Sequence, residues 1–223
     1  MRITAVIPAY NEGERIGATL EGVKKVREIN RILVVNDGST DDTAEKVKKA
    51  GVELLDLEVN RGKGGAMNAA LPYLQDADIV VFLDGDLGET AAEASKIIKP
   101  VMEGEADLCI AAFGPPSKKG GFGLVKGTAA WIIKKTGNLE AVAPLSGQRA
   151  MTREVLEAVT PFKEAYGVEL GMTLSALRKG FRVLEVPTSM RHNETGRDIK
   201  GFMHRGKQFI DVLKVIKDEL RRK

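Results

Sequence analysis

The sequence predicts an α/β protein, a three-layer fold with a mostly parallel central sheet. Through residues 1–113, short β-branched runs alternate with segments of helical period. The runs are apolar throughout, as expected of strands that a parallel sheet buries on both faces. Short polar loops follow four of the runs. Strands that alternate with helices in this way form βαβ units, with helices on both faces of the sheet.

Five strands and four helices are expected in this first half. The expected strands are residues 3–8, 32–35, 52–57, 79–83 and 108–113, and the expected helices are residues 16–27, 41–50, 64–74 and 91–103. The first helix has apolar residues at helical spacing, which gives it one buried face. Asp41 or Asp42 can cap the second helix, because a carboxylate accepts hydrogen bonds from the first backbone N–H groups.

The second half of the chain is less regular. Residues 114–127 hold five glycines, two prolines and three lysines, which fits either a solvated loop or an active-site lid. Helices are expected at 124–136, 153–159 and 169–179, a strand at 181–187 and a last helix from about residue 201. We expect a single domain over residues 1–223, divided at 113 and 200.

Composition limits the classes of function. The chain has 223 residues, a net charge of +3, 43% hydrophobic and 29% charged residues, which are ordinary globular values. The single cysteine, Cys109, excludes an intramolecular disulfide framework and a multi-cysteine zinc site. No apolar run approaches the roughly 20 residues of a membrane-spanning helix, and the N-terminus does not resemble a signal peptide. These features predict a reduced, cytoplasmic setting.

The positive charge is concentrated at the C-terminus. Residues 191–223 contain ten Lys and Arg against five Asp and Glu, a net of +5, which leaves +3 minus +5, or −2, for the remainder. A net charge this small gives no reason to expect nucleic acid as a partner. The amphipathic helix expected over 201–223 can pack its apolar face on the protein or contact an anionic membrane.

Four polar loops should meet at one edge of the sheet. They are residues 9–12, 36–39, 60–63 and 84–86. Ligands of open parallel sheets bind outside the carboxyl ends of the strands, so these loops are the expected site. The strongest signal is Asp84-Gly85-Asp86, directly after the most apolar strand. Two carboxylates two residues apart can hold a divalent cation, which would neutralise a departing diphosphate.

Two further segments fit a nucleotide site. Asp37 can accept hydrogen bonds from a base or ribose, although a strand followed by a capped helix would give the same pattern. The glycines of residues 60–65 admit close backbone approach, and Arg61 or Lys63 can meet phosphate. The chain has no P-loop spacing, and no Gly-x-Gly-x-x-Gly follows the first strand, which disfavours a dinucleotide dehydrogenase.

Together and in this order, the motifs resemble the family 2 glycosyltransferases of GT-A fold. The resemblance rests on residues 6–12 (VIPAYNE), 36–43 (NDGSTDDT), 62–64 (GKG) and 83–86 (LDGD), and more weakly on 145–149 (LSGQR) and 166–169 (YGVE). It implies a Rossmann-like nucleotide-binding fold. In that fold, residues 1–113 would be the nucleotide-sugar-binding half, 114–200 the acceptor half and 201–223 a basic C-terminal helix.

The resemblance also implies roles for individual residues. The donor would be bordered by Pro8, Ala9, Tyr10, Glu12, Asp37, Lys63, Asp84 and Gly85; a Mn²⁺ or Mg²⁺ ion would be held by Asp84, Asp86 and His192; and the acceptor would meet Ser146, Gly147, Arg149 and Arg197. Asp86 and Glu169 would be catalytic. Glu169 would be the base for a hydroxyl acceptor, or only an orienting group for a phosphate acceptor. A surface histidine and an N-terminal helix residue are the plainer interpretations of His192 and Glu169.

Two branches of the family share these motifs. Residues 146–149 resemble a segment of the dolichol- or polyprenyl-phosphate sugar synthases. Residues 166–169 and His192 resemble glucosyl-3-phosphoglycerate synthases. Residues 87–90 (LGET) depart from the continuation typical of dolichol-phosphate mannose synthases, and the Gln-x-x-Arg-Trp motif of processive synthases is absent. Family 2 implies inversion at the sugar, whereas the phosphoglycerate-type resemblance implies retention, so the stereochemical outcome stays open.

The sequence therefore predicts a metal-dependent glycosyltransferase. It would move one sugar from a nucleotide donor, expected to be UDP-linked, to a small acidic or polyprenyl-phosphate acceptor. A homodimer and peripheral membrane contact through residues 201–223 are further hypotheses. Two alternatives remain. A sugar-1-phosphate nucleotidyltransferase would need a glycine-rich basic loop after the first strand, and a non-catalytic nucleotide-sugar-binding module would be expected to lose the metal residues.

Overall fold

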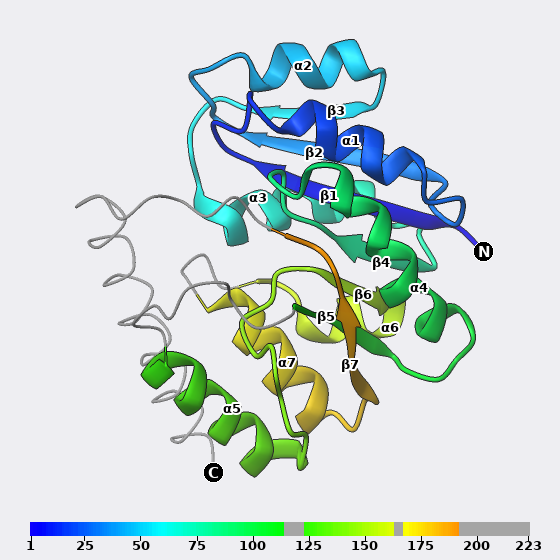
Figure 1. The fold of residues 1–223 in the computed structure, drawn as a ribbon, viewed down its shortest axis with the longest axis vertical. Helices are drawn as coiled ribbons and strands as arrows, with labels where there is room; N and C mark the ends of the chain where they lie inside the picture. Colours follow the sequence, from blue (N-terminus) through cyan, green and yellow to red (C-terminus); the bar gives the residue numbers. More distant parts are fainter. Residues whose placement is uncertain (114–122, 163–166, 192–223) are drawn as a thin grey trace.

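A seven-stranded sheet forms the centre of the computed structural model, which describes residues 1–113, 123–162 and 167–191 (Figure 1). The strands are β1 (Ile3–Ala9), β2 (Arg31–Asp37), β3 (Glu53–Leu57), β4 (Ile79–Phe82), β5 (Leu108–Phe113), β6 (Arg149–Thr152) and β7 (Val183–Thr188). Their order across the sheet is β3-β2-β1-β4-β6-β5-β7. All neighbouring pairs are parallel except those made by β6, which runs antiparallel to both β4 and β5. The prediction of a mostly parallel sheet is confirmed.

Helices cover both faces of the sheet. They are α1 (Ile16–Lys24), α2 (Thr43–Ala50), α3 (Gly62–Ala70), α4 (Ser95–Met102), α5 (Gly123–Gly137), α6 (Arg153–Val159) and α7 (Val168–Arg178), with 3-10 turns η1 (Leu71–Tyr73) and η2 (Gly88–Ala94). One core lies between the sheet and α1, α2 and α4, and a second between the sheet and α3, α6 and α7. The sheet and the helices on its two faces make the three predicted layers.

Helix α5 lies outside the three layers. Its residues Ala129, Ile132 and Ile133 pack on Leu170 and Leu174 of α7 in a third, smaller apolar cluster (Figure 1). The second half therefore places α7 between the sheet and α5. No helix in the described ranges is long and apolar enough to cross a bilayer.

Element boundaries differ from the sequence expectation where backbone geometry intervenes. The helix expected over residues 91–103 begins earlier, at Gly88, as a 3-10 turn and becomes α-helical only at Ser95. The helix expected from residue 64 begins at Gly62, whose φ is +74°. Helix α2 begins at Thr43, two residues later than expected, and its N-cap residue Asp42 makes no side-chain capping bond; the Asp41 carboxylate instead accepts the Thr43 N–H at 3.0 Å.

Strand β6 was not foreseen as a strand. Its four residues, Arg149 to Thr152, include an arginine and a threonine, so they do not form the apolar run expected of a central strand. The ladder with β4 places Arg149 opposite Phe82, and the ladder with β5 places it opposite Ile110. Because β6 is antiparallel, its amino end meets the carboxyl ends of β4 and β5. Residues just before β6 therefore lie at the same edge as Asp84.

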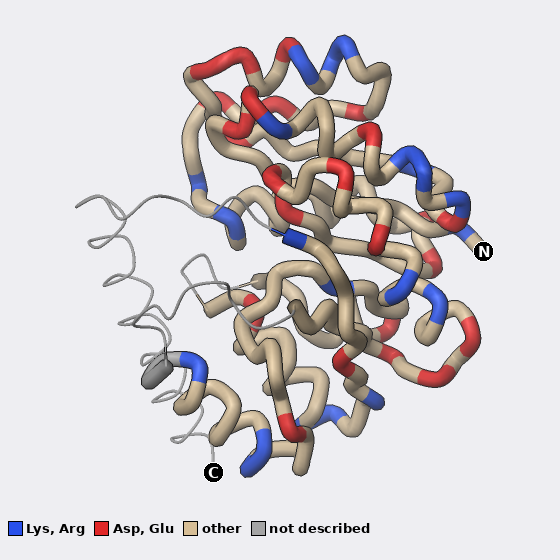
Figure 2. The backbone as a smooth tube through the Cα atoms, in the orientation of Figure 1, with Lys and Arg blue, Asp and Glu red and all other residues tan. Residues whose placement is uncertain are grey.

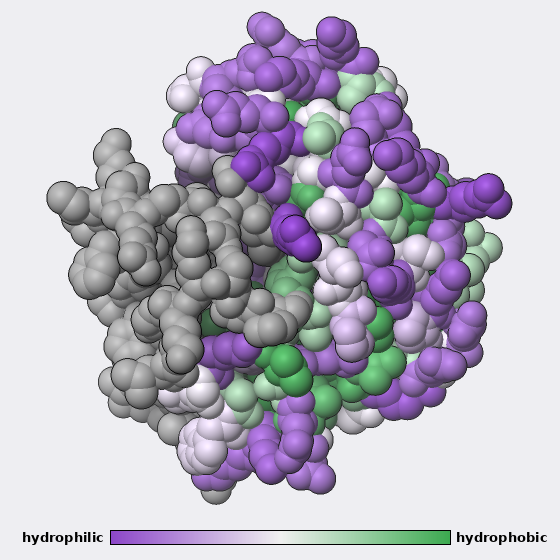
Figure 3. All heavy atoms as spheres, in the orientation of Figure 1, coloured by the Kyte–Doolittle hydropathy of each residue, from purple (hydrophilic) through white to green (hydrophobic). Residues whose placement is uncertain are grey.

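Charged residues of both signs are spread over the described chain (Figure 2), and hydrophilic residues cover most of the described surface in the view of Figure 3. Cys109 is fully buried within β5, and burial raises the pKa of its thiol to about 12. The thiol is therefore a packing group in the core, as the sequence indicates.

Candidate active site

The loops after β1 and β2 are held together by their own side chains. The Asn11 N–H donates to Ser39 Oγ at 2.9 Å, and Asn11 Oδ1 in turn accepts the Thr40 N–H at 2.8 Å. The Glu12 N–H donates to Thr43 Oγ1 at 2.9 Å. The predicted convergence of these two loops at one edge of the sheet is confirmed.

The loop before α3 is fixed to the same edge through Asp37. This carboxylate is only 3% exposed, and its Oδ1 accepts the Arg61 N–H at 2.8 Å. Gly38 allows the close approach: its φ is +69°, and a Cβ there would lie 2.7 Å from the backbone nitrogen of Asn60. Asp37 thus lies at the carboxyl end of β2, and its carboxylate is held in place by the loop before α3.

Lys63 joins the first half of the chain to the second. Its Nζ lies 2.7 Å from Asp84 Oδ1 and 2.9 Å from Glu169 Oε1. Burial lowers the pKa of Lys63, but the two carboxylates outweigh it and raise that pKa above its usual value. Lys63 is therefore a permanent cation between the donor-side and acceptor-side carboxylates that the sequence predicted.

Glu169 is held in its ionised form. Its side chain is 16% exposed, and burial by itself would raise the pKa of the carboxyl. The charge and hydrogen bond of Lys63, followed by the charge of Arg149, overcome burial and leave the pKa of Glu169 below its usual range. Glu169 belongs to the first turn of α7, so the macrodipole of that helix also favours the carboxylate.

The loop before β6 and the first residue of that strand, residues 146–149, complete the cluster. Gln148 is fully buried, and its Nε2 donates to Asp84 Oδ2 at 2.7 Å. A Cβ at Gly147 would lie 2.4 Å from Lys63 Nζ and 2.9 Å from Asp84 Oδ2, so only glycine fits without displacing them. The predicted acceptor segment therefore does lie against the predicted donor residues.

The structure changes the role expected of Arg149. Its side chain is completely buried, with Nε donating to the Ser146 carbonyl at 2.8 Å and Nη1 to Thr173 Oγ1 at 2.8 Å. Burial lowers the pKa of this guanidinium to about 10, against the opposing influence of Glu169 and Glu185. A side chain enclosed in this way supports the 146–149 loop and α7 from within, rather than presenting its guanidinium to an acceptor at the surface.

Glu12 and the Asp84-Gly85-Asp86 loop form a carboxylate-rich corner. A Cβ at Gly85 would lie 3.3 Å from Glu12 Cγ, so the two loops touch. Burial, then the charges of Asp86 and Asp84, raise the pKa of Glu12 to about 7. This accumulation of negative charge fits a divalent cation, because hard oxygen ligands are those that Mg²⁺ and Mn²⁺ prefer. Within the described ranges, no three His, Cys, Asp or Glu side chains form a metal-binding group by themselves.

The remaining predicted site residues differ in exposure, and some lie outside the described residues. Tyr10 is 48% exposed beside buried Ala9, and Ser146 is buried. His192, Arg197, Tyr166 and the segment 201–223 lie outside the described residues. The described chain reaches Arg191, whose backbone N–H donates to Thr90 Oγ1 at 3.1 Å, four residues after Asp86.

Sequence reasoning missed two polar residues of the cluster, Gln148 and Thr173. Thr173 links the buried Arg149 to α7, and its hydroxyl donates to the Glu169 carbonyl at 3.0 Å. The sequence marks Gln148 only as a member of the LSGQR segment. The sequence signal available for Gln148 was a polar amide next to a strand. Its partner Asp84 lies 64 residues away and is identified only by the tertiary structure.

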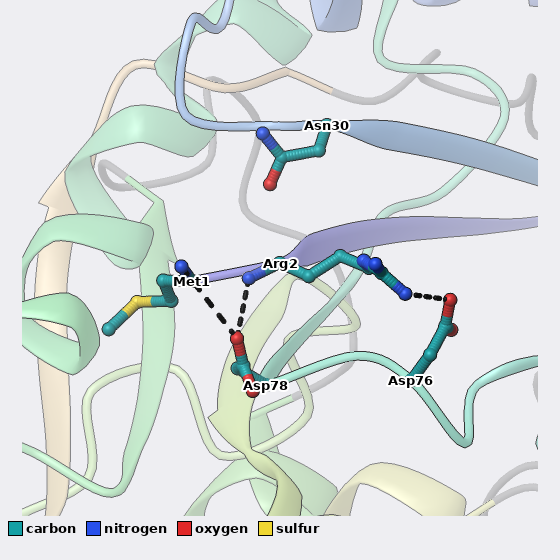
Figure 4. A pocket seen from close by; sticks show the side chains of 5 residues that line it. All are labelled: Met1, Arg2, Asn30, Asp76 and Asp78. Carbon is teal, nitrogen blue, oxygen red and sulfur yellow. Dashed lines mark hydrogen bonds and ion pairs between the residues drawn. The ribbon is translucent and has the colours of Figure 1, made fainter.

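A separate cavity of about 560 Å³ lies at the opposite edge of the sheet, among Met1, Arg2, Asn30, Asp76 and Asp78 (Figure 4). Its charges pair with one another: Arg2 bonds Asp76 through its guanidinium and Asp78 through its backbone N–H, the latter at 2.6 Å. The cavity holds none of the predicted site residues. The cluster around Lys63 is therefore the candidate active site.

Residues 4–148 match the protein-family model "Glycosyl transferase family 2". The chain belongs to this family. The matched region includes the four loops at the edge of the sheet and reaches Gln148, so it covers the donor side of the cluster. Family 2 membership identifies the protein as a glycosyltransferase, which decides against the nucleotidyltransferase and the non-catalytic module.

Individual relatives are similar to this chain over most of its length. The chain is 30% identical to the uncharacterized protein MJ1222 of Methanocaldococcus jannaschii, over 96% of this chain and 89% of the relative. It is 27% identical to the undecaprenyl-phosphate mannosyltransferase of Micrococcus luteus, over 88% and 86% of the two chains. It spans only 58% of the length of a glucosyl-3-phosphoglycerate synthase to which it is 28% identical.

A solved structure confirms the GT-A fold. Glucosyl-3-phosphoglycerate synthase of Mycobacterium tuberculosis, in complex with Mn²⁺, UDP-glucose and phosphoglyceric acid, superposes with a TM-score of 0.75 at 25% identity. The match covers 96% of this chain and 78% of that one. Both branches expected from the sequence motifs are thus represented among the similar proteins.

Proposed function

We propose that this family 2 glycosyltransferase transfers one sugar from a UDP-linked donor to an anionic acceptor, with the help of a divalent cation. The acceptor is either a small acid or a polyprenyl phosphate, both of which carry negative charge. The observation that carries the proposal is the Lys63 bridge, which brings Asp84 of the donor half and Glu169 of the acceptor half to within 2.7 and 2.9 Å of one ammonium group.

The donor would lie across the loops at the carboxyl ends of β1, β2 and β4. Asp37 would accept hydrogen bonds from the uracil or ribose, and Pro8, Ala9, Tyr10 and Glu12 would border the nucleoside. Lys63 would meet the diphosphate, because a cation flanked by glycines can approach phosphate oxygens closely. The similar synthase binds UDP-glucose, which supports a uridine donor here.

A divalent cation would be held by Asp84 and Asp86, with His192 as the proposed third ligand. Bound there, it would supply positive charge to the departing diphosphate. The carboxylate-rich corner around Glu12 supports this assignment, because burial and the charges of Asp86 and Asp84 raise the pKa of Glu12 to about 7. The hydrogen bond from the Arg191 N–H to Thr90 Oγ1 supports His192 as a ligand. Arg191 precedes His192 in the chain, and Thr90 lies four residues after Asp86.

The acceptor would lie beside Ser146, Gly147 and Glu169. The close approach of the Gly147 backbone to Lys63 and Asp84 leaves little room between the acceptor segment and the donor residues. With Lys63 bonded to it, Glu169 is a weak base, because its pKa is held below its usual range. A donor diphosphate that draws Lys63 away would raise the basicity of Glu169, so the carboxylate would take a proton from an acceptor hydroxyl only after donor binding. For a phosphate acceptor, Glu169 would only orient the group.

The test is an incubation with UDP-glucose, GDP-mannose and other donors, with Mn²⁺ or Mg²⁺, against two acceptor panels. One panel holds small phosphorylated acids and the other holds polyprenyl phosphates in detergent. The expected result is metal-dependent nucleotide release from a UDP-sugar with one of the panels. Absence of release with every donor and acceptor would overturn the proposal. Transfer from a GDP-sugar alone would overturn the uridine assignment.

The proposal also includes two partners: a membrane, contacted through the basic segment 201–223, and a second copy of the chain in a homodimer. The net charge of +5 over residues 191–223 supports contact with anionic lipid. Co-sedimentation with vesicles rich in phosphatidylglycerol would be compared between the full chain and a chain ending at Gly206. Equal binding by both would defeat the membrane assignment. Sedimentation equilibrium of the full chain would decide the dimer.

A further inference from the structure

Gln148 is a buried amide with a fixed orientation. Its side chain has no exposed surface, and the Ser146 hydroxyl donates to its Oε1 at 3.3 Å. The opposite end of the amide, Nε2, therefore faces Asp84 and donates to Oδ2 at 2.7 Å. Its backbone carbonyl accepts the Ala111 N–H at 3.0 Å, which ties the residue to β5. Both the backbone and the amide of Gln148 are thus held in place.

Both carboxylate oxygens of Asp84 are in contact with a donor side chain. Lys63 Nζ lies 2.7 Å from Oδ1, and Gln148 Nε2 lies 2.7 Å from Oδ2. Hydrogen bonds to an ionised acceptor are shorter and about twice as strong as neutral ones, so the pair fixes the plane of the carboxylate. Lys63 is a long, flexible side chain that also bonds Glu169, whereas Gln148 lies against the core. Gln148 is the rigid member of the pair.

We propose that Gln148 is a positioning residue of the donor site, which holds the Asp84 carboxylate in the orientation that the nucleotide donor requires. The proposal rests on the proposed function in one respect, that Asp84 serves the donor. Gln148 acts from the segment that also contains Ser146 and Gly147. The donor carboxylate is thereby oriented by the loop that forms the acceptor side.

The chemistry at this position admits few substitutes. Methionine has nearly the same shape but donates no hydrogen bond, so Asp84 Oδ2 would lose a donor in a partly buried site, where an unmet hydrogen bond is costly. Glutamate has the same shape and would place a second carboxylate 2.7 Å from Oδ2, where like charges repel. Both Gln148→Met and Gln148→Glu should release Asp84 without changing the volume of the core.

The experiment measures UDP binding by calorimetry in the presence of Mn²⁺, together with steady-state kinetics. Gln148→Met should weaken UDP binding about tenfold, the effect of losing one charge-assisted hydrogen bond, and raise the donor KM more than it lowers kcat. Gln148→Glu should weaken UDP binding at least as much. It tests the same role if the Gln148→Met variant fails to fold. Gln75→Met is the matched control, because Gln75 is an exposed glutamine. It should bind UDP like the wild type.

Equal UDP affinity in the wild type and the folded Gln148→Met variant would overturn the positioning role. A crystal structure of that variant gives a second readout that needs no ligand. The Asp84 carboxylate is expected to rotate away from its wild-type orientation, and an unchanged orientation would also overturn the inference. If the wild type binds no uridine nucleotide, the proposed function fails, and the orientation of Asp84 in the variant still decides the role of Gln148.

Discussion

The two halves of this glycosyltransferase build their parts of the active site in different ways. In residues 1–113, most predicted site residues lie at or just beyond the carboxyl ends of parallel strands, as Asp37 ends β2 and Asp84 follows β4, whereas Lys63 lies in the first turn of α3. In residues 123–191, Gln148 precedes an antiparallel strand, and Glu169 is the second residue of a helix. The proposed donor half follows a general rule of open parallel sheets, whereas the position of Gln148 in the proposed acceptor half depends on how one short strand pairs.

The same residue type behaves oppositely in the two halves. Burial and the charges of Asp86 and Asp84 raise the pKa of Glu12 to about 7. Glu169 is also buried, yet Lys63 and Arg149 hold its pKa below the usual range. The donor side thus carries surplus negative charge, which a cation would relieve, while the acceptor side is already balanced. Four substitutions test this contrast.

The largest effect is expected from Asp86→Asn on the donor side. Loss of a proposed metal ligand should abolish the Mn²⁺-dependent part of UDP binding and lower the transfer rate about 10³-fold, the equivalent of several kcal/mol. Calorimetry with and without Mn²⁺ measures the first effect. Asp42→Asn makes the same charge change at an exposed ion pair with Lys46 and should leave UDP affinity within about twofold. Unchanged affinity in Asp86→Asn would remove that residue from the metal site.

The next largest effect is expected from Glu169→Gln, which changes a residue of the proposed acceptor side. With a hydroxyl acceptor, kcat should fall about 10²-fold, because a general base contributes on the order of 10² to 10⁴. UDP affinity should change little, since Glu169 meets the donor only through Lys63. Kinetics and UDP calorimetry on the same preparation separate the two. Loss of UDP binding as large as in Asp86→Asn would place Glu169 on the donor side and break the contrast between the halves.

Glu12→Gln tests the surplus negative charge through stability. The pKa of Glu12 rises from about 4.5 in the unfolded chain to about 7 in the folded protein. The folded state therefore keeps a proton that the unfolded state releases, and the stability associated with it, present below pH 4.5, is lost as the pH rises through 7. The loss is about 2 kcal/mol after allowance for partial solvation, from the 1.36 kcal/mol per pKa unit.

Urea unfolding at pH 5 and pH 8 measures this loss. Glu12→Gln cannot ionise at this position, so it should be more stable relative to the wild type at pH 8 than at pH 5 by about 2 kcal/mol. Glu58→Gln, at an exposed glutamate, should show the pH dependence of the wild type. Parallel stability profiles for the wild type and Glu12→Gln would show that the corner around Asp84 and Asp86 carries no such strain.

The smallest effect is expected from Gly147→Ala. The new Cβ would lie 2.4 Å from Lys63 Nζ, at the end of a flexible side chain, so Lys63 should move while the fold is kept. UDP affinity should fall about tenfold, because the contact between Lys63 and Asp84 is lost. Gly171→Ala is the control: a Cβ there meets nothing within 4 Å, and alanine should stabilise α7 by about 0.5–1 kcal/mol. Wild-type UDP affinity in Gly147→Ala would show that the acceptor loop does not constrain Lys63.

Much of the donor half could be predicted from the sequence because its signals are local. An apolar run followed by Asp84-Gly85-Asp86 indicates both a buried strand and a polar loop at its carboxyl end. Helix bounds were less certain, since the switch from 3-10 to α-helix at Ser95 has no sequence signal. The buried state of Arg149 could not be predicted, because arginine is among the residues that are rarely enclosed.

The sequence by itself determined the α/β class, the four loops at one edge of the sheet and the resemblance to family 2. Periodicity, β-branched runs and turn residues act over a few neighbours, so they can be read along the chain. Only the tertiary structure decided that Lys63 bridges Asp84 and Glu169, and that Gln148 donates a hydrogen bond to Asp84. The contact between Gln148 and Asp84 follows from the antiparallel pairing of β6 between β4 and β5. That pairing arises from burial in the sheet, which joins residues far apart in sequence, and not from a local preference of residues 149–152.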